Sequence, residues 1–399
     1  MKQKIFENSI KKLSFSGTLK YAEKAREMRR AGITIKRFGS QPDTPIHIKE
    51  AAKRMIDTKD AAGYTNVSGV SELRNVISRK LKQENGIEVD PDYEITVTIG
   101  GKGALFLALM ALITPNDEVI LQNPGWPSIR SLIHLAGGVP ISLFLKEEKE
   151  WGIEEGDIEK LITPRTKMIV INDPHNPTGS ILDKKTLNYI IDIAKEYDLF
   201  IVTDECYERI IDPSRKHYSI ASFAGMKDRT ISVFTTTKLY NMYGWRVGYV
   251  TANKMISEKM QTIQSHTMGC APSMAQAGAI AALSEDIASG DMIMNNYNKE
   301  YKQSRDTIVE GFNNISKVSC ARARGGYFLF PNFSNSGLSS IKLHEYLLKH
   351  GFFMVPGIEF GINGEGHLRC SFGLGLEEIK ENLKELKIVL EKLQIKGSL

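Results

Sequence analysis

The sequence predicts an α/β protein with a large domain, built on a mostly parallel sheet covered by helices on both faces, and a smaller α+β domain. Three observations lead to this prediction. Strand-like and helical segments alternate for roughly two hundred residues from Tyr93 onward. Most of the strand-like runs are continuously apolar or β-branched, as in parallel sheets covered on both faces. At 399 residues the chain is also too long for one compact core, so two domains are expected.

The elements of the large domain follow from local patterns. Helices are expected up to about residue 36 and over 48–57 and 71–84, where apolar residues recur at helical spacing. Glycines and prolines between 38 and 45 exclude regular structure there. The predicted strands are 95–99, 118–122, 140–144, 167–171, 199–203 and 230–234.

From about Ser284 the pattern changes to a long helical stretch and then to an α+β tail. The final helix of this tail has one apolar face, formed by Ile379, Leu383, Leu386, Leu390 and Leu393. The tail and the N-terminal segment are expected to form one small domain. We therefore predict a large domain over 46–290 and a small domain from 1–45 and 291–399.

Bulk composition excludes several classes of protein. Hydrophobic residues make up 42% and charged residues 25% of the chain, as in ordinary globular proteins. A net charge of +5 is small and dispersed, so neither a nucleic-acid nor a membrane partner is expected. Four separated cysteines argue against a zinc site and fit the reducing cytoplasm. No signal peptide is apparent in residues 1–7.

A polar stretch at 235–248 follows the last strand of the alternating region. Lys238 comes directly after three threonines and is followed by Arg246 and two glycines. Threonine hydroxyls and a fork-shaped guanidinium can hold a phosphate while the lysine amine reacts with a carbonyl group. A solvated lysine and a surface arginine are the alternative interpretation, because short motifs produce false positives.

Four further polar loops follow predicted strands, where ligands bind in parallel sheets. Glycines at 100–103 can bring backbone amides to an anion at a helix start, although tight turns also use glycine for steric reasons. Trp126 can stack on a planar ring or pack in a core. Pro174 and Pro177 make the loop after the strand at 167–171 rigid, so that it can aim the Asn176 amide inward. Asp204 and Tyr207 follow the strand at 199–203. A buried carboxylate at Asp204 would need a cationic partner, such as a protonated pyridine nitrogen. The alternative is that Asp204 caps the next helix.

Together these loops resemble a known family. The motifs are Asn-Pro-Thr-Gly at 176–179, Asp-Glu-Cys-Tyr at 204–207, Thr-Lys at 237–238 and Gly-Trp-Arg-Val-Gly at 244–248. In this combination the chain resembles the class I/II pyridoxal-phosphate-dependent aminotransferases, the aspartate-aminotransferase-like family of fold type I. The resemblance runs in order from residue 39 to Arg369. It implies the fold of these transferases and pyridoxal 5'-phosphate as cofactor.

The resemblance also assigns roles to individual residues. Lys238 would form the Schiff base, Asp204 would pair with the pyridine nitrogen, and Tyr207 would bond the ring hydroxyl, so these three form the implied catalytic set. The implied cofactor contacts are Tyr64, Gly101, Lys102, Gly103, Trp126, Asn176, Asp204, Tyr207, Thr235, Thr237, Lys238 and Arg246. The implied substrate contacts are Gly39, Trp126, Asn176 and Arg369, with Arg369 on the α-carboxylate.

Tyr64 is expected to reach the cofactor phosphate of a neighbouring subunit, so the resemblance implies a homodimer with shared active sites. The implied reaction moves an amino group between an L-amino acid, of aspartate, glutamate or aromatic type, and a 2-oxo acid such as 2-oxoglutarate. Lys102 either reads a distal carboxylate or contributes only its backbone amide. Gly103, Gly125 and the spacing of 39–42 depart from the usual family pattern.

Two other functions compete with this prediction. A β-elimination lyase, or another enzyme acting at Cα, would share the same ring-binding residues. A non-enzymatic cofactor-binding or regulatory module is the third hypothesis. Its fusion to a DNA-binding domain would require an additional N-terminal segment.

Overall fold

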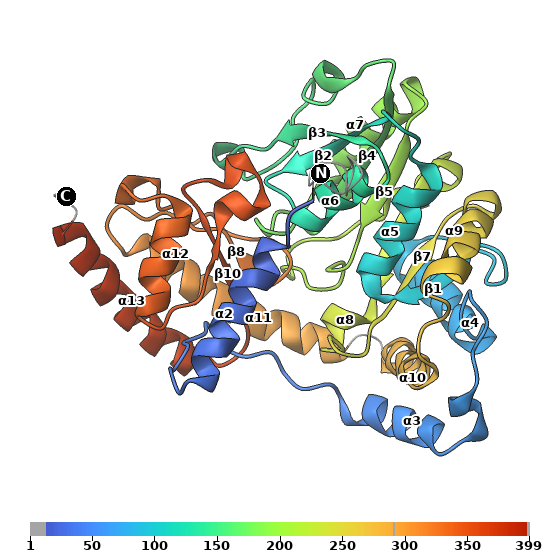
Figure 1. The fold of residues 1–399 in the computed structure, drawn as a ribbon, viewed down its shortest axis with the longest axis horizontal. Coiled ribbons are helices and arrows are strands. Elements are labelled where there is room, and N and C mark those ends of the chain that lie inside the picture. Colours follow the sequence, from blue (N-terminus) through green and yellow to red (C-terminus); the bar gives the residue numbers. More distant parts are fainter. Residues whose placement is uncertain (1–12, 290–291, 397–399) are drawn as a thin grey trace, which may run out of the picture.

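The structure is a computed structural model that describes residues 13–289 and 292–396 (Figure 1). Residues 1–7, for which no signal peptide is expected, lie outside the described residues, as does the predicted domain boundary at 290/291. Among the helices of the described ranges, none combines the length and the apolar character needed to cross a bilayer.

A seven-stranded sheet forms the centre of the larger part of the molecule, with strand order β1-β7-β6-β5-β4-β2-β3. Its strands are β1 (Ile95–Ile99), β2 (Glu118–Asn123), β3 (Val139–Phe144), β4 (Thr166–Asn172), β5 (Phe200–Asp204), β6 (Thr230–Thr235) and β7 (Val247–Thr251). The pairs from β3 through β6 are parallel, whereas β7 is antiparallel to both of its neighbours. The prediction of a mostly parallel sheet is therefore confirmed, and the six predicted strands differ from the observed ones by at most one residue at each end.

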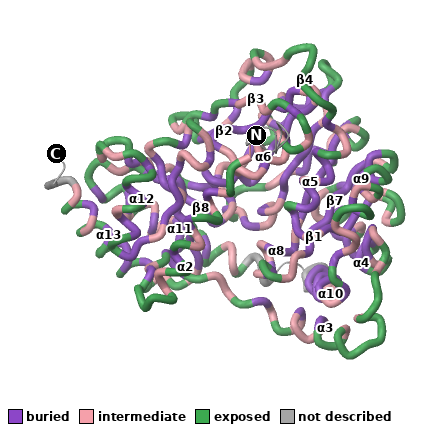
Figure 2. Tube along the Cα trace, in the orientation of Figure 1, coloured by how far each residue is buried: buried purple, intermediate pink, exposed green. Residues whose placement is uncertain are grey.

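Both faces of this sheet are buried against helices, as predicted. Met168 and Val170 of β4 pack with α5 (Gly100–Leu112), α6 (Pro127–Leu135) and α9 (Lys254–Thr267). Ile169 and Ile171, which alternate with them, pack on the other side with α7 (Lys184–Glu196). Side chains of a strand point alternately to opposite faces, so an unbroken apolar run supplies both cores. Figure 2 shows the resulting burial along the strands.

The smaller part of the molecule is built on a three-stranded antiparallel sheet of order β8-β10-β9. These strands are β8 (Phe328–Leu329), β9 (Val355–Pro356) and β10 (Leu368–Ser371). Its helices are α11 (Met292–Asn313), α12 (Ser340–Lys349) and α13 (Leu376–Lys396), whose apolar residues share one core with Phe38 and Phe372. A smaller domain is thus confirmed, while the exact residue boundaries of the two domains stay a prediction.

Local structure differs from the expectations in three places. The first helix, α2 (Gly17–Arg30), ends before residue 36, because Gly32 adopts a left-handed conformation (φ 80°) and the chain then becomes extended. The expected glycine loop is instead the first turn of α5. One helical turn, α8 (Thr236–Leu239), lies within the stretch expected to be a loop. The connecting helices α3 (Ile46–Ile56), α4 (Ser71–Lys80) and α10 (Ser273–Ser289) complete the described fold.

Candidate active site

A cavity of about 580 Å³ opens where β1, β4, β5 and β6 end, between the two sheets. Residues from both parts of the molecule line it, so neither part forms it alone. The predicted site residues on its walls are Gly101, Lys102, Trp126, Asn176, Asp204, Tyr207, Thr235, Thr237, Lys238, Arg246 and Arg369. The polar loops that are separate in the sequence therefore converge on one space.

Lys238 enters this cavity from α8, the short helix that follows β6. Its ammonium lies 4.9 Å from the ring centroid of Tyr243 and 5.7 Å from that of Tyr207. The pKa of Lys238 is lowered to about 8, mainly by burial and also by the charges of Arg369 and Arg246, while Cys206 and Asp204 oppose this shift. An amine with this pKa is substantially neutral at mildly alkaline pH, as a nucleophile or general base requires.

Asp204 forms a buried acidic wall of the same cavity at the end of β5. Its Oδ1 accepts a bond from the Cys206 amide (3.3 Å). Within the described ranges, no lysine, arginine or histidine forms an ion pair with this carboxylate. Burial raises the pKa of Asp204, and hydrogen bonds from Cys206 and the charge of Lys238 partly offset this rise. A cationic group in the cavity would therefore stabilise the carboxylate.

The start of α5 and the start of α8 form a second wall, suited to an anion. The side chain of Thr235 caps α8 by accepting the Thr237 amide (3.1 Å), and the two hydroxyls are 2.7 Å apart. Arg246, which has a positive φ of 59°, reaches the first residues of α5. A Cβ added to Gly100 would lie 2.4 Å from Arg246 Nη2, so a side chain there would displace the guanidinium. Helix starts, hydroxyls and a guanidinium are a typical phosphate environment.

Arg369 stands opposite, on β10 of the smaller sheet. Its Nη1 donates to Asn176 Oδ1 (3.0 Å), and its guanidinium carbon lies 4.5 Å from the ring centroid of Phe328. Burial lowers the pKa of Arg369. Its Nε is buried and has no hydrogen-bond partner, which leaves a donor available for a ligand carboxylate.

Three predicted residues do not line this cavity. Gly103 is buried inside α5, Gly39 lines a neighbouring cavity, and the side chain of Tyr64 is 100% exposed. The sequence interpretation also missed several wall residues: Thr18, Leu19, Gln41, Cys206, Tyr243, Tyr327, Phe328 and Ser371. Tyr243 and Tyr327 hydrogen-bond through their hydroxyls (2.9 Å). The only sequence signal for Tyr243 was its place within the lysine stretch.

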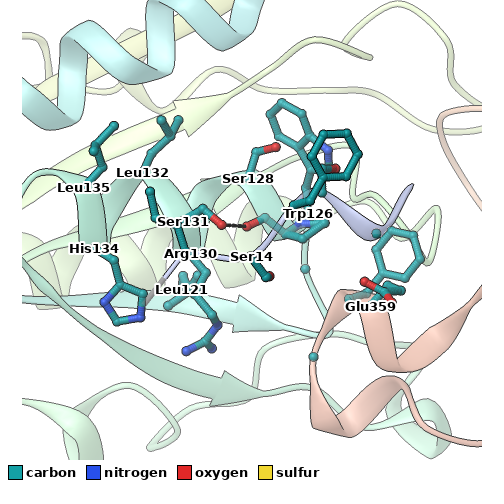
Figure 3. A pocket seen from close by; sticks show the side chains of 18 of the residues that line it. Ser14, Leu121, Trp126, Ser128, Arg130, Ser131, Leu132, His134, Leu135 and Glu359 are labelled. Carbon is teal, nitrogen blue, oxygen red and sulfur yellow. Dashed lines mark hydrogen bonds between the residues drawn. The ribbon is translucent and has the colours of Figure 1, made fainter. Parts of the chain in front are cut away.

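A second space of about 450 Å³ is lined by Trp126 (Figure 3). Lys102 and Trp126 line both this space and the first cavity. The Lys102 ammonium lies 5.2 Å from the Trp126 ring centroid. Burial, and then Arg246, lower the pKa of Lys102. Trp126 also packs against the core beneath α5 and α6, and its stacking on a ligand ring stays a prediction. Lys102 is thus available to a ligand through its side chain.

The fold and this cavity define an α/β protein with a partly buried lysine at the carboxyl edge of its sheet. A family model described as aminotransferase class I and II matches residues 34–386, and the chain belongs to this family. Members of the family depend on pyridoxal phosphate in general. The chain is an aminotransferase, as predicted, so the regulatory-module hypothesis is not supported.

Similar proteins come from several organisms. The chain is 34% identical to aromatic-amino-acid aminotransferase 2 of Thermococcus litoralis, over 88% of this chain and 90% of the relative. It is 36% identical to a probable aspartate/prephenate aminotransferase of Aquifex aeolicus, over 96% and 98%. The structure of aspartate aminotransferase from Thermus thermophilus with maleate is similar, with a TM-score of 0.90 and 30% identity, covering 96% of this chain and 99% of that one.

Proposed function

We propose that the chain binds pyridoxal 5'-phosphate in the 580 Å³ cavity and transfers amino groups from aspartate, glutamate or an aromatic amino acid to a 2-oxo acid such as 2-oxoglutarate. The observation that carries the proposal is the placement of Lys238, with its lowered pKa, in one cavity with the unpaired buried carboxylate of Asp204. The catalytic set proposed is Lys238, Asp204 and Tyr207.

The side chains present fit this cofactor at both of its ends. Asp204 needs a cation, and a protonated pyridine nitrogen is one. Thr235, Thr237, Arg246 and the first amides of α5 suit a phosphate. Asn176 and Tyr207 supply further polar groups to the wall of the same cavity. When bound, pyridoxal phosphate supplies an aldehyde that accepts the amino group and a ring that spreads negative charge from Cα.

The chain's own residues then carry the proton transfers and the positioning. Lys238 Nζ, once neutral, would take the proton from the substrate Cα and hold it as an ammonium until it is returned. Arg369 holds the substrate α-carboxylate through the donors that Asn176 leaves free. Asp204 keeps the cationic group beside it protonated. The positive charge of that group stabilises the negative charge that develops at Cα.

Substrate choice is proposed to depend on Lys102. Its ammonium stands over Trp126, on the wall shared with the second cavity of Figure 3. A distal carboxylate of aspartate or glutamate would gain a charge-assisted hydrogen bond there. An aromatic side chain would instead use the ring of Trp126. The names of the relatives include both substrate classes.

We further propose a homodimer in which Tyr64 of each subunit completes the partner's phosphate site. A tyrosine that is 100% exposed in one chain would gain burial and a hydrogen bond at such an interface. Four unpaired cysteines support the cytoplasm as the location. The domain limits proposed remain 46–290 for the large domain, with 1–45 and 291–399 for the small one.

The test of the proposed function is a half-reaction. The holoenzyme is mixed separately with L-aspartate, L-glutamate and L-phenylalanine, while its visible absorption is recorded and the 2-oxo acid is assayed. We expect loss of the visible band together with formation of the matching 2-oxo acid from at least one donor. Release of pyruvate and ammonia from a cysteine conjugate, without any 2-oxo acid acceptor, would instead indicate lyase chemistry.

A further inference from the structure

A third cavity, of about 330 Å³, adjoins the substrate cavity at Arg369. The two cavities share Gln41, Arg369 and Ser371 as wall residues. Helix α2 forms one wall of the third cavity, and the chain from Arg37 to Gln41, together with β10, forms the opposite wall. Three more arginines line this space, Arg26, Arg29 and Arg37, and the proposed reaction uses none of them.

The sheet side of this cavity is arginine-rich for a geometric reason. The Gly373 amide donates to the Phe38 carbonyl (2.8 Å), and Phe38 pairs in parallel with Phe372, so the chain near Phe38 extends the smaller sheet. Side chains alternate along extended chain. Phe38 and Phe372 enter the small-domain core, and Arg37 and Arg369 therefore project from the opposite face of the same sheet.

The helix side adds two more guanidinium groups. Ala22, Ala25, Arg26 and Arg29 recur at helical spacing on one stripe of α2, and this stripe covers the sheet face. Arg26 is neutralised by Glu23, to which its Nε donates (2.9 Å). Within residues 13–289 and 292–396, by contrast, no carboxylate pairs with Arg29 or Arg37.

The arginines of this cavity repel one another. Arg29 and Arg37 line the same cavity, and burial, and then the charge of Arg37, lower the pKa of Arg29. Arg369, which lines both cavities, adds a third positive charge. Positive charges gathered around a cavity without a counter-ion are unfavourable. Guanidinium groups bind carboxylate and phosphate oxygens through paired hydrogen bonds, so an oxyanion would remove the repulsion.

We propose that the Arg29–Arg37 cavity is an oxyanion-binding site at the entrance to the substrate cavity. It is separate from the contact between Arg369 and the substrate α-carboxylate. The oxyanion is either a carboxylate of a dicarboxylic substrate, held before it reaches Arg369, or a free phosphate. Because binding needs no turnover, this site can be tested whether or not the proposed substrates are correct.

The test is calorimetric titration of the holoenzyme with inorganic phosphate at constant ionic strength. We expect saturable binding to the wild type, about tenfold weaker in Arg37→Gln and in Arg29→Gln, because each change removes a charge-assisted contact. Arg37 is exposed, so its variant should fold normally. Arg30→Gln is the matched control. It removes the same charge from α2, at a residue that pairs with Glu23 (3.7 Å) and does not line the cavity.

Two results would overturn the proposal: no saturable binding of phosphate to the wild type, or equal affinity in Arg37→Gln, Arg29→Gln and Arg30→Gln. A second titration, with succinate present, distinguishes the two sources. Succinate is a diacid without an amino or oxo group. If succinate competes with phosphate in the wild type but not in Arg37→Gln, the result supports a site for a substrate carboxylate. Phosphate binding that is unaffected by succinate supports it as a free-anion site.

Discussion

Replacing Lys102 by glutamine tests how the enzyme distinguishes acidic from aromatic donors. Glutamine keeps much of the side-chain length and removes the charge that stands 5.2 Å from the Trp126 ring centroid. A hydrogen bond to a charged group contributes about 1.5–3 kcal/mol. Lys102 is partly exposed, so solvent screening favours the lower figure, about 1.5 kcal/mol, which corresponds to about tenfold in kcat/KM.

The assay compares kcat/KM for L-aspartate and L-phenylalanine with one acceptor, 2-oxoglutarate. We expect the aspartate to phenylalanine ratio to fall about tenfold in Lys102→Gln. Lys254→Gln is a matched control, because the Lys254 ammonium also stands over an aromatic ring, that of Tyr93 (4.0 Å), but it does not line the cavity. If the ratio is unchanged in Lys102→Gln, the lysine side chain does not read a distal carboxylate.

The pH dependence gives an independent check on the same residue. Burial and Arg246 lower the pKa of Lys102, so its positive charge is lost at a lower pH than that of an exposed lysine. The kcat/KM for aspartate should therefore decline at alkaline pH before that for phenylalanine. Parallel decline for both donors would contradict this assignment.

Three further predictions concern the cofactor site and stability. The rate at which apoenzyme captures pyridoxal phosphate should become about tenfold higher at pH 9 than at pH 7, because Lys238, with a pKa of about 8, loses its proton in this range. A flat stopped-flow profile would refute this. Tyr64→Phe should release cofactor faster on dilution, while the dimer persists in gel filtration. Tyr93→Phe, which alters another exposed tyrosine, should not release cofactor faster. Equal release rates in the two variants would exclude Tyr64 from the phosphate site. Arg305→Met should lower the free energy of unfolding by about 3–5 kcal/mol in urea titrations, because it leaves Asp212, whose side chain is 3% exposed, without its cationic partner. Adding Asp212→Leu should recover much of this loss, and failure to do so would show that the cost is not electrostatic.

The sequence alone determined the strands of the large sheet and the order of the polar loops. Continuous apolar runs such as the one around Val170 specify buried strands, because both of their faces need apolar side chains. The ends of parallel strands meet at one edge. Asn176, Asp204 and Lys238 could therefore be assigned to one site before any contact was known, since each follows a predicted strand.

Only the tertiary structure decided how distant segments meet. The connection after β6 contains α8 and is too short for a parallel crossover, so β7 returns antiparallel to β6. The pairing of β7 with β1 joins strands far apart in the sequence, and no local pattern indicates it. The contact of Tyr243 with Tyr327 joins residues far apart in sequence. The lowered pKa of Lys238 requires burial, which depends on both parts of the molecule.

The position of Arg37 shows the same distinction. In the sequence it is one basic residue among many, next to a glycine- and proline-rich stretch. Because Phe38 pairs with Phe372, the side chain of Arg37 lies on the sheet face that carries Arg369, under helix α2. The local sequence excludes regular structure between residues 38 and 45, but it does not select a partner for this segment. The strand beside which it lies is decided by long-range packing, because the apolar side chain of Phe38 is buried only in the small-domain core.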